Sequence, residues 1–398
     1  MTTSIAHRTT GWFSTADCSL DDFKALVGQQ TDLGDYPHAD AVERNVLIYG
    51  EKLRLATRTA SGRTAVQTEL IRALTDGPGI VVFKQAFGDL SVVDRASEAF
   101  LTQISVEKEA GLGGGDHFAK PGANDRVWGA LDKLAVAEPA VFAEYYANDI
   151  IALVSESWLG PGYQVTSQVN VVRPGGQAQE PHRDYHLGFL TDDVIARYRS
   201  HVHALSPVLT LQGAVAHSDM PLESGPTLYL PYSHHYVPGY LAWRREEFKH
   251  YFADHHVQLP LRKGDAAFFN PALFHGAGHN RSTDIRRMAN LLQVSSAFGR
   301  AMETVDRVAM CRALFPVLLE KRSGGMPDKD LDNVIAAAAE GYAFPTNLDR
   351  DQPVDGMAPQ TQADLLRQAL TEEWTLKAFE AALEAHAART RPDPGSVA

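Results

Sequence analysis

Two histidines and one aspartate, far apart in the chain, are the residues best suited to carry chemistry. His182 and Asp184 are two positions apart, directly after Pro181, and His275 follows an apolar run that predicts a strand. On extended backbone, residues at i and i+2 point to the same side, so an imidazole and a carboxylate can reach one metal ion. With His275 they would form a ligand set that holds iron(II) and leaves coordination positions open.

These residues also allow other interpretations. Zinc accepts the same ligands, so a zinc-dependent hydrolase is a second hypothesis, although the sequence offers no evident acid–base residue for it. A third hypothesis is a non-catalytic jelly-roll binding protein that keeps the three residues as structure. His186 could pair with His182 on a helix, but the glycines at 175–176 and Pro181 favour extended backbone there.

Strands must hold these side chains, and the centre of the chain predicts several. From Tyr163 to Val172, apolar and polar residues alternate, as in a strand with one polar face. Gln168 and Asn170 lie on that polar face, where they bind a co-substrate or substrate, or else face solvent at a sheet edge. Further strands are expected at residues 80–83, 208–217, 227–231, 256–262, 265–270 and 287–297. This pattern is typical of an antiparallel β sandwich or barrel.

Helical patterns flank the predicted strands. Helices are expected at residues 64–76 and 90–104, and again after residue 299, where Met302 and Val305 have helical spacing. A last amphipathic helix is predicted from Gln362 to Ala388. The segments 116–118 and 126–128, which follow the helix expected at 90–104, are expected to be surface loops. The alternative is that they cover the site.

Composition excludes several classes of function. The chain has 398 residues, a formal net charge of -12 and no run of lysine or arginine, which argues against a general nucleic-acid or anionic membrane surface. It lacks an apolar run of about 20 residues and a secretory signal pattern, so a soluble, cytoplasmic protein is expected. Its two cysteines, Cys18 and Cys311, predict neither a disulfide framework nor a thiolate metal site.

The segment around the distal histidine carries a resemblance to a known family. Residues 261–282 resemble the phytanoyl-CoA dioxygenase family of iron(II)- and 2-oxoglutarate-dependent oxygenases, and so do residues 223–228, 231–234 and 77–87. The resemblance implies a mainly β protein whose double-stranded β-helix core (a jelly roll, cupin-like) has flanking helices. The resemblance covers roughly residues 64–298, which are expected to form the oxygenase domain. Residues 1–63 are then an N-terminal extension, and the helical patterns after residue 299 predict a C-terminal helical extension over 299–398, packed on the core.

The resemblance also implies roles for individual residues. In the family, the HxD pair and the distal histidine bind iron, so His182, Asp184 and His275 would be the metal ligands and catalytic residues. An arginine about eleven residues beyond the distal histidine holds the far carboxylate of 2-oxoglutarate, which points to Arg286. Arg281 and Arg287 are alternatives. Because strand residues alternate between faces, only one of Arg286 and Arg287 can face the cavity.

Two positions depart from the family's pattern close to this site. Ala277 lies two residues after the distal histidine, where the family often has serine. Tyr232 stands before Ser233-His234, where the family usually has glycine. Glycine at such a place indicates a turn, so Tyr232 is expected to affect the local backbone and not the metal.

The reaction implied by the resemblance consumes dioxygen and 2-oxoglutarate and releases succinate and carbon dioxide, while a small-molecule metabolite is oxidised. Hydroxylation is the expected outcome, and desaturation or cyclisation would use the same ligands. Related halogenases lack the carboxylate ligand, so Asp184 argues against halogenation.

Overall fold

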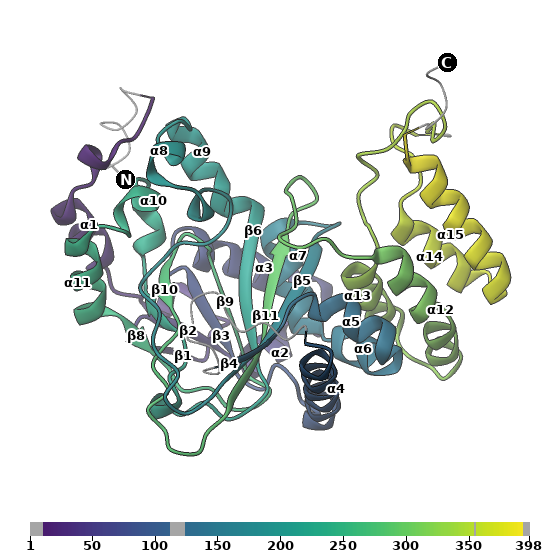
Figure 1. Ribbon diagram of the computed structural model, residues 1–398, viewed down its shortest axis with the longest axis horizontal. Coiled ribbons are helices and arrows are strands. Elements are labelled where there is room, and N and C mark those ends of the chain that lie inside the picture. The colour runs from purple at the N-terminus through teal and green to yellow at the C-terminus, as the bar shows by residue number, and fades with distance from the viewer. Residues whose placement is uncertain (1–10, 112–123, 354–355, 393–398) are drawn as a thin grey trace.

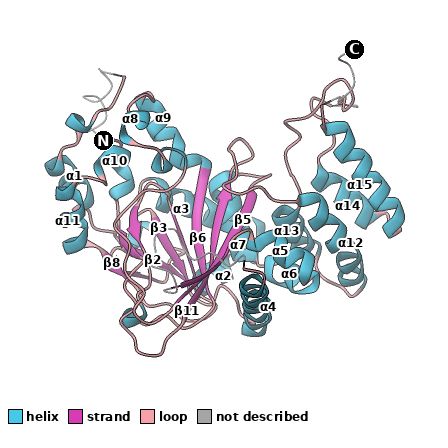
Figure 2. Ribbon diagram, in the orientation of Figure 1, coloured by secondary structure: helices cyan, strands magenta, loops and turns pink. Residues whose placement is uncertain are grey.

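The computed structural model describes residues 11–111, 124–353 and 356–392, which form a mixed α/β structure (Figure 1). The described strands make one eight-stranded and one three-stranded sheet. More residues lie in helices than in strands, as Figure 2 shows, so the prediction of a mainly β chain is wrong in its proportions. The helical excess comes from segments whose apolar faces cover one side of the larger sheet.

The eight-stranded sheet combines strands that are far apart in the sequence. In spatial order its strands are β1 (Ala41–Glu43), β2 (Val46–Tyr49), β3 (Ile80–Phe83), β9 (Ala266–Phe269), β6 (Thr210–Ala216), β11 (Arg287–Ser295), β5 (Gln164–Val172) and β4 (Asn124–Val127). Neighbours are antiparallel except β2 and β3, which are parallel. The predicted strands at 80–83, 163–172, 208–217, 265–270 and 287–297 are therefore confirmed to within a few residues.

The three-stranded sheet is short. It consists of β10 (Phe274–Gly276), β7 (Leu228–Leu230) and β8 (Val257–Gln258), in that order. Strand β8 has only two residues, so the strand predicted over 256–262 is largely wrong. In β10, Phe274 packs against Phe23 of helix α1 (Leu20–Val27) in a small aromatic cluster, which ties the N-terminal segment to the strand that carries His275.

The helices gather in groups around the sheets (Figure 1). Before β5 come α2 (Glu51–Ala56), α3 (Ala60–Thr75), α4 (Leu90–Glu109), α5 (Ala130–Ala137), α6 (Pro139–Tyr146) and α7 (Asp149–Leu159). Between β5 and β8 come α8 (Asp192–Ile195), α9 (Ser200–Leu205), α10 (Gly239–Ala242) and α11 (Glu246–His255). After β11 come α12 (Arg307–Ser323), α13 (Asp328–Ala338), α14 (Gln362–Thr371) and α15 (Leu376–Thr390). None of the described helices combines the length and apolar character that crossing a membrane requires.

The C-terminal helices differ from the sequence expectation in two places. Helix α12 begins at Arg307, so Met302 and Val305 lie in the loop before it. The single helix predicted over 362–388 is two helices, because Glu373 adopts a left-handed conformation (φ 51°) and the Thr375 hydroxyl caps a new start. A continuous apolar stripe in the sequence hid that break.

Residues of the larger sheet largely alternate between its two faces, and Leu292 of β11 belongs to the core and also touches the cavity described below. On one face, Val165, Val169 and Val171 of β5 join the main hydrophobic core under the helices. The same core receives Leu292 and Val294 of β11. The apolar face predicted from Tyr163 to Val172 is thus confirmed, and the opposite face is left for the site described below.

Tyr232 adopts a backbone conformation that glycine usually occupies. Its φ is 66°, in the left-handed region that favours glycine. Its hydroxyl lies 2.8 Å from Thr31 Oγ1, so the side chain connects the N-terminal segment to the loop after β7. A hydrogen bond therefore offsets the strain that a non-glycine residue meets here.

Candidate metal centre

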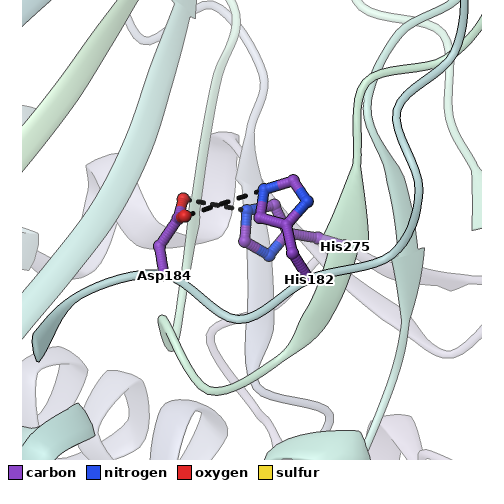
Figure 3. Close-up of side chains that lie close together, drawn as sticks. All are labelled: His182, Asp184 and His275. Atoms are coloured by element: carbon purple, nitrogen blue, oxygen red, sulfur yellow. Dashed lines mark ion pairs between the residues drawn. The ribbon is translucent and has the colours of Figure 1, made fainter. Parts of the chain in front are cut away.

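The structure brings His182, Asp184 and His275 together in one cluster (Figure 3). The ligand atoms that these three side chains offer all lie within 4.8 Å of one another. Asp184 Oδ1 is 3.7 Å from His182 Nε2, and Asp184 Oδ2 is 3.4 Å from His275 Nε2. Among the described residues, no other group of three or more histidines, cysteines and acids has this spacing.

Backbone pairing explains how residues so far apart in sequence meet. His182 N donates to His275 O at 2.9 Å, and His275 N donates to His182 O at 3.2 Å, which forms an isolated antiparallel bridge. The segment around His182 is therefore extended, as predicted from Pro181 and the preceding glycines. His186 instead begins a short 3-10 helix, and its Nδ1 lies 3.1 Å from Ser206 Oγ, so it is not part of the cluster.

Both imidazole rings are oriented by their own backbone. Nδ1 of His182 lies 3.0 Å from Glu180 O, and Nδ1 of His275 lies 2.9 Å from Leu273 O. A carbonyl only accepts, so each Nδ1 donates to its carbonyl and each Nε2 is the ring nitrogen that faces Asp184. This is how second hydrogen bonds commonly fix metal-binding histidines.

Asp184 is held as a carboxylate. Burial acts to raise its pKa, but the charge of His182, the interactions with His275 and the hydrogen bond from Gln212 outweigh it and place the pKa below its usual value. An ionised carboxylate beside two imidazole nitrogens is the charge state that a divalent cation requires.

Arg183, between the two predicted ligands, fixes the segment from behind. Its side chain is almost completely buried and donates to the carbonyls of Ser233 at 2.6 Å and Tyr236 at 2.8 Å. The guanidinium also lies over the rings of Tyr240 and Phe274. Because Arg183 points away from the cluster, its neighbours on both sides point toward it.

A cavity of about 180 Å³ adjoins the cluster. Its floor is the second face of the larger sheet, where small residues leave the space open. Alanines on three adjacent strands line it: Ala267 on β9, Ala214 and Ala216 on β6, and Ala289 on β11. Ala214 is opposite Ala267, and Ala216 is opposite Ala289, so the small side chains form one continuous patch.

Arg287, and not Arg286, faces this cavity. The side chain of Arg286 is 58% exposed and lies 3.6 Å from Asp125. β11 begins at Arg287, which pairs with Val172 and lines the cavity. The family spacing points to Arg286, one residue before the arginine that lines the cavity, and one residue reverses the face of a strand. Arg281, the other alternative, is exposed to solvent.

Arg287 is a buried cation that has no acidic partner among the described residues. It is 7% exposed, and burial lowers its pKa to about 10, so it stays charged at neutral pH. No carboxylate of the described residues lies within ion-pairing distance of it. A buried charge is costly unless paired, so this side of the cavity is suited to an anionic group from a ligand.

The polar face of β5 contributes unequally to the cavity. Asn170 lines it, and its Oδ1 has no hydrogen-bond partner among the described residues. Gln168 is fully buried beside it, where it accepts a hydrogen bond from Arg126 and approaches Met302. Strand β5 lies between β11 and β4, so the alternative that these residues face solvent at a sheet edge is wrong.

Two residues of the segment expected to be a surface loop also reach the cavity. Arg126 and Trp128 line it, with the Arg126 guanidinium 4.2 Å from the centre of the Trp128 ring. The segment 116–118 lies outside the described residues. In the sequence, the alternation of Arg126 and Trp128 around Val127 could have indicated a strand with both side chains on one face. The strand that forms there, β4, has only four residues, which are too few to establish a strand period.

Comparison with known proteins gives one family. The family described as Phytanoyl-CoA dioxygenase (PhyH) matches residues 67–288, which is more than half of the chain. A curated relative, "Dioxygenase trt7" of Aspergillus terreus, is 28% identical over 161 residues, which are 38% of this chain and 51% of the relative. The chain thus spans about half the length of the curated relative it matches.

Solved structures of similar arrangement share little sequence with this chain. The non-heme alpha ketoglutarate dependent epimerase SnoN from nogalamycin biosynthesis is 20% identical, with a TM-score of 0.41 over 59% of this chain and 84% of its own. HygX from Streptomyces hygroscopicus, solved with nickel, 2-oxoglutarate and hygromycin B, is 17% identical, with a TM-score of 0.40 over 59% of this chain and 90% of its own.

Proposed function

Because this chain belongs to the phytanoyl-CoA dioxygenase family, we propose that it is an iron(II)- and 2-oxoglutarate-dependent dioxygenase that oxidises a small-molecule metabolite. One observation carries the proposal. A single cavity contains a cluster of two histidines and a carboxylate and also contains Arg287, a buried arginine that forms no ion pair with the acidic residues the structure describes. A zinc hydrolase would use the cluster but would leave this arginine without a role.

Each part of the cavity has a task in this proposal. His182, Asp184 and His275 hold the iron, which when bound supplies the activation of dioxygen. Arg287 binds the far carboxylate of 2-oxoglutarate with its two-pronged guanidinium. Asn170 takes a position next to the co-substrate, and Gln168 supports it by holding Arg126 at the cavity wall. Arg287 replaces Arg286 in the role that the family spacing suggested.

The architecture supports the same proposal. We assign the two sheets to a double-stranded β-helix, because the cluster sits where β10 of the smaller sheet approaches the segment that follows β5 of the larger one. The oxygenase domain would span 64–298, which contains the residues matched by the family. Residues 1–63 and 299–398 would be extensions, although β1 and β2 of the first add strands to the larger sheet.

Hydroxylation is the proposed outcome, with succinate and carbon dioxide as the products from 2-oxoglutarate. The presence of the Asp184 carboxylate supports hydroxylation over halogenation, since a halide would need its place on the metal. Mass spectrometry of the product distinguishes hydroxylation, which adds one oxygen atom, from desaturation or cyclisation, which removes two hydrogens.

The decisive experiment compares the two adjacent arginines. Oxygen-free protein is titrated with iron(II) and 2-oxoglutarate, and the weak visible charge-transfer band of a metal-chelated 2-oxo acid is recorded. His182→Ala should abolish the band, because one of the three ligands is lost. Arg287→Met should raise the concentration of 2-oxoglutarate needed by about 100-fold, since losing one member of a buried charge pair costs about 2–5 kcal/mol.

Arg286→Met is the matched control for that variant. It removes the same charge one residue away, but from the exposed side of the strand, so the titration should stay within about twofold of wild type. A band that depends on Arg286 and not on Arg287 would contradict the assignment. If the wild-type protein gives no band and binds zinc tightly, the dioxygenase proposal is wrong and a zinc-dependent hydrolase becomes the favoured function.

A further inference from the structure

Two glutamines line the cavity next to Asp184 and lie opposite each other on neighbouring strands. Gln212 of β6 is paired in register with Gln293 of β11. Both line the cavity, and they are 5% and 7% exposed. Gln212 donates a hydrogen bond from Nε2 to Asp184 Oδ2. The pair of carboxamides therefore begins directly beside the metal cluster.

The free ends of these carboxamides are hydrogen-bond acceptors. Oε1 of Gln212 and Oε1 of Gln293 are buried and have no partner among the described residues. The orientation of Gln212 is fixed by chemistry, because the Asp184 carboxylate can only accept, so Nε2 must face it and Oε1 must face the other way. Buried acceptors without a partner are rare and call for an explanation, and a donor on a bound ligand supplies one.

The charges around the cavity decide what kind of donor fits. Asp184 is the only acidic residue among the described residues that line it, whereas Arg126 and Arg287 bring positive charge. Among the described residues that line the cavity, a buried ammonium group would find no carboxylate of its own, because Asp184 is engaged by the metal cluster. Leu291 and Met302 add apolar surface to the same wall. A neutral donor on an apolar molecule fits these conditions.

We propose that Gln212 and Gln293 form a subsite for a hydroxyl group of a neutral, largely apolar substrate. The inference rests on the proposed function and specifies its substrate class. Arg287 and Gln293 lie on the same face of β11, six residues and roughly 20 Å apart along an extended strand. The co-substrate anchored at Arg287 and the substrate held at Gln293 thus occupy opposite halves of the cavity, with the metal cluster accessible to both.

Three probes of equal size test this subsite: cyclohexanol, cyclohexanone and cyclohexylamine. The full-length protein is loaded with 2-oxoglutarate and manganese(II), which relaxes nearby nuclei, or with zinc(II) as the diamagnetic reference. Proton relaxation of each probe, titrated at neutral pH, gives its affinity and its closeness to the metal without any turnover. We expect cyclohexanol to bind about tenfold more tightly than cyclohexanone, because only the alcohol donates to the carboxamide oxygens.

Variants at Gln293 sharpen the test. Gln293→Leu should remove the preference for the alcohol, and Gln293→Glu should transfer it to the amine. Gln177→Leu is the matched control. Gln177 is exposed, and its side chain donates a hydrogen bond only to Gly175 O, so the variant should leave the tenfold preference unchanged. The Glu variant keeps the test valid if the Leu variant does not fold.

The possible results separate the two proposals. If manganese and 2-oxoglutarate bind by calorimetry but the ketone binds as well as the alcohol, the hydroxyl subsite is wrong and the proposed function stands. If Gln293→Leu keeps the preference for the alcohol, the subsite is likewise wrong. If neither the metal nor 2-oxoglutarate binds to the wild-type protein, the proposed function fails and the subsite fails with it.

Discussion

The two faces of the larger sheet are built from the same strands and have opposite characters. Toward the helices, β5, β6 and β11 present valine and leucine that belong to the main hydrophobic core, such as Val165, Val215 and Val294. Toward the cavity, the same strands present alanine, glutamine and arginine. The comparison shows that one face supplies packing energy and the other supplies a binding site, although a single residue separates them along the chain.

Polar groups on the two faces differ in the same way. His217, at the end of β6, is buried on the helix side, and both its ring nitrogens have partners: Nδ1 lies 2.9 Å from Ser97 Oγ and Nε2 lies 2.9 Å from Tyr145 OH. Gln212, on the cavity side of β6, has its amide nitrogen bonded to Asp184, while its amide oxygen has no partner among the described residues. Within β6 and its continuation, the partnered ring of His217 stabilises the fold, whereas the free carboxamide oxygen of Gln212 is positioned to accept a hydrogen bond from a ligand.

The largest expected effect on stability is the loss of Leu292 of β11, and its neighbour Leu291 provides the comparison. Leu292→Ala should lower the free energy of unfolding by about 2–5 kcal/mol, because the side chain is fully buried in the main core and its loss leaves a cavity. Leu291→Ala, one residue earlier on the cavity face, should cost about 1 kcal/mol or less. Urea denaturation of the metal-free protein measures both, and equal losses would contradict the difference between the faces.

An intermediate effect should depend on pH through His217. Burial lowers the pKa of His217 to about 3, far below the usual 6.5, so the folded protein keeps the ring neutral. The unfolded chain takes up the proton as pH falls below 6.5, which removes stability progressively from there down to about pH 3. Between pH 7 and pH 5 this should cost about 2 kcal/mol.

His217→Gln isolates that contribution. The amide can still contact Ser97 and Tyr145 but does not titrate, so the pH dependence of unfolding should be flatter by about 2 kcal/mol over the same interval. Parallel curves for the variant and the wild type would assign the pH dependence to other groups.

The smallest effect on stability should accompany a large effect on binding. Ala289→Leu places a larger side chain in the cavity and fills part of its open space. The free energy of unfolding should therefore change by less than about 1 kcal/mol, while the affinity for 2-oxoglutarate falls at least about tenfold. Ala266→Leu, on the helix face of β9, should instead cost about 1–3 kcal/mol by overpacking the core. Thermal unfolding and calorimetry distinguish these outcomes, and a strongly destabilised Ala289→Leu would show that the cavity is not open space.

The sequence predicted the parts of the site that depend on short-range rules. The i, i+2 spacing of His182 and Asp184 and the alternation from Tyr163 to Val172 both describe extended backbone, and the structure has it in both places. The meeting of His275 with this pair followed from the family resemblance, since no local rule connects residues so far apart.

Other features depend on register and long-range packing, which one sequence does not contain. Strand alternation predicted that Arg286 and Arg287 lie on opposite faces. It did not predict which of them faces the cavity, because that depends on the pairing of Arg287 with Val172. Gln212 and Gln293 gave no signal for the same reason, since they become neighbours only through the pairing of β6 with β11. The helix break at Glu373 was missed because the apolar stripe continues through it.

The continuous patch of alanines on the cavity floor has a consequence for how such a protein can change over time. Because this floor contributes little packing energy, its residues can be exchanged for larger or more polar ones without bringing the fold near its stability threshold. Selection or laboratory evolution for a new substrate can therefore act on Ala214, Ala216 and Ala289 independently of the helix-covered core, so that one scaffold can accommodate a succession of differently shaped molecules.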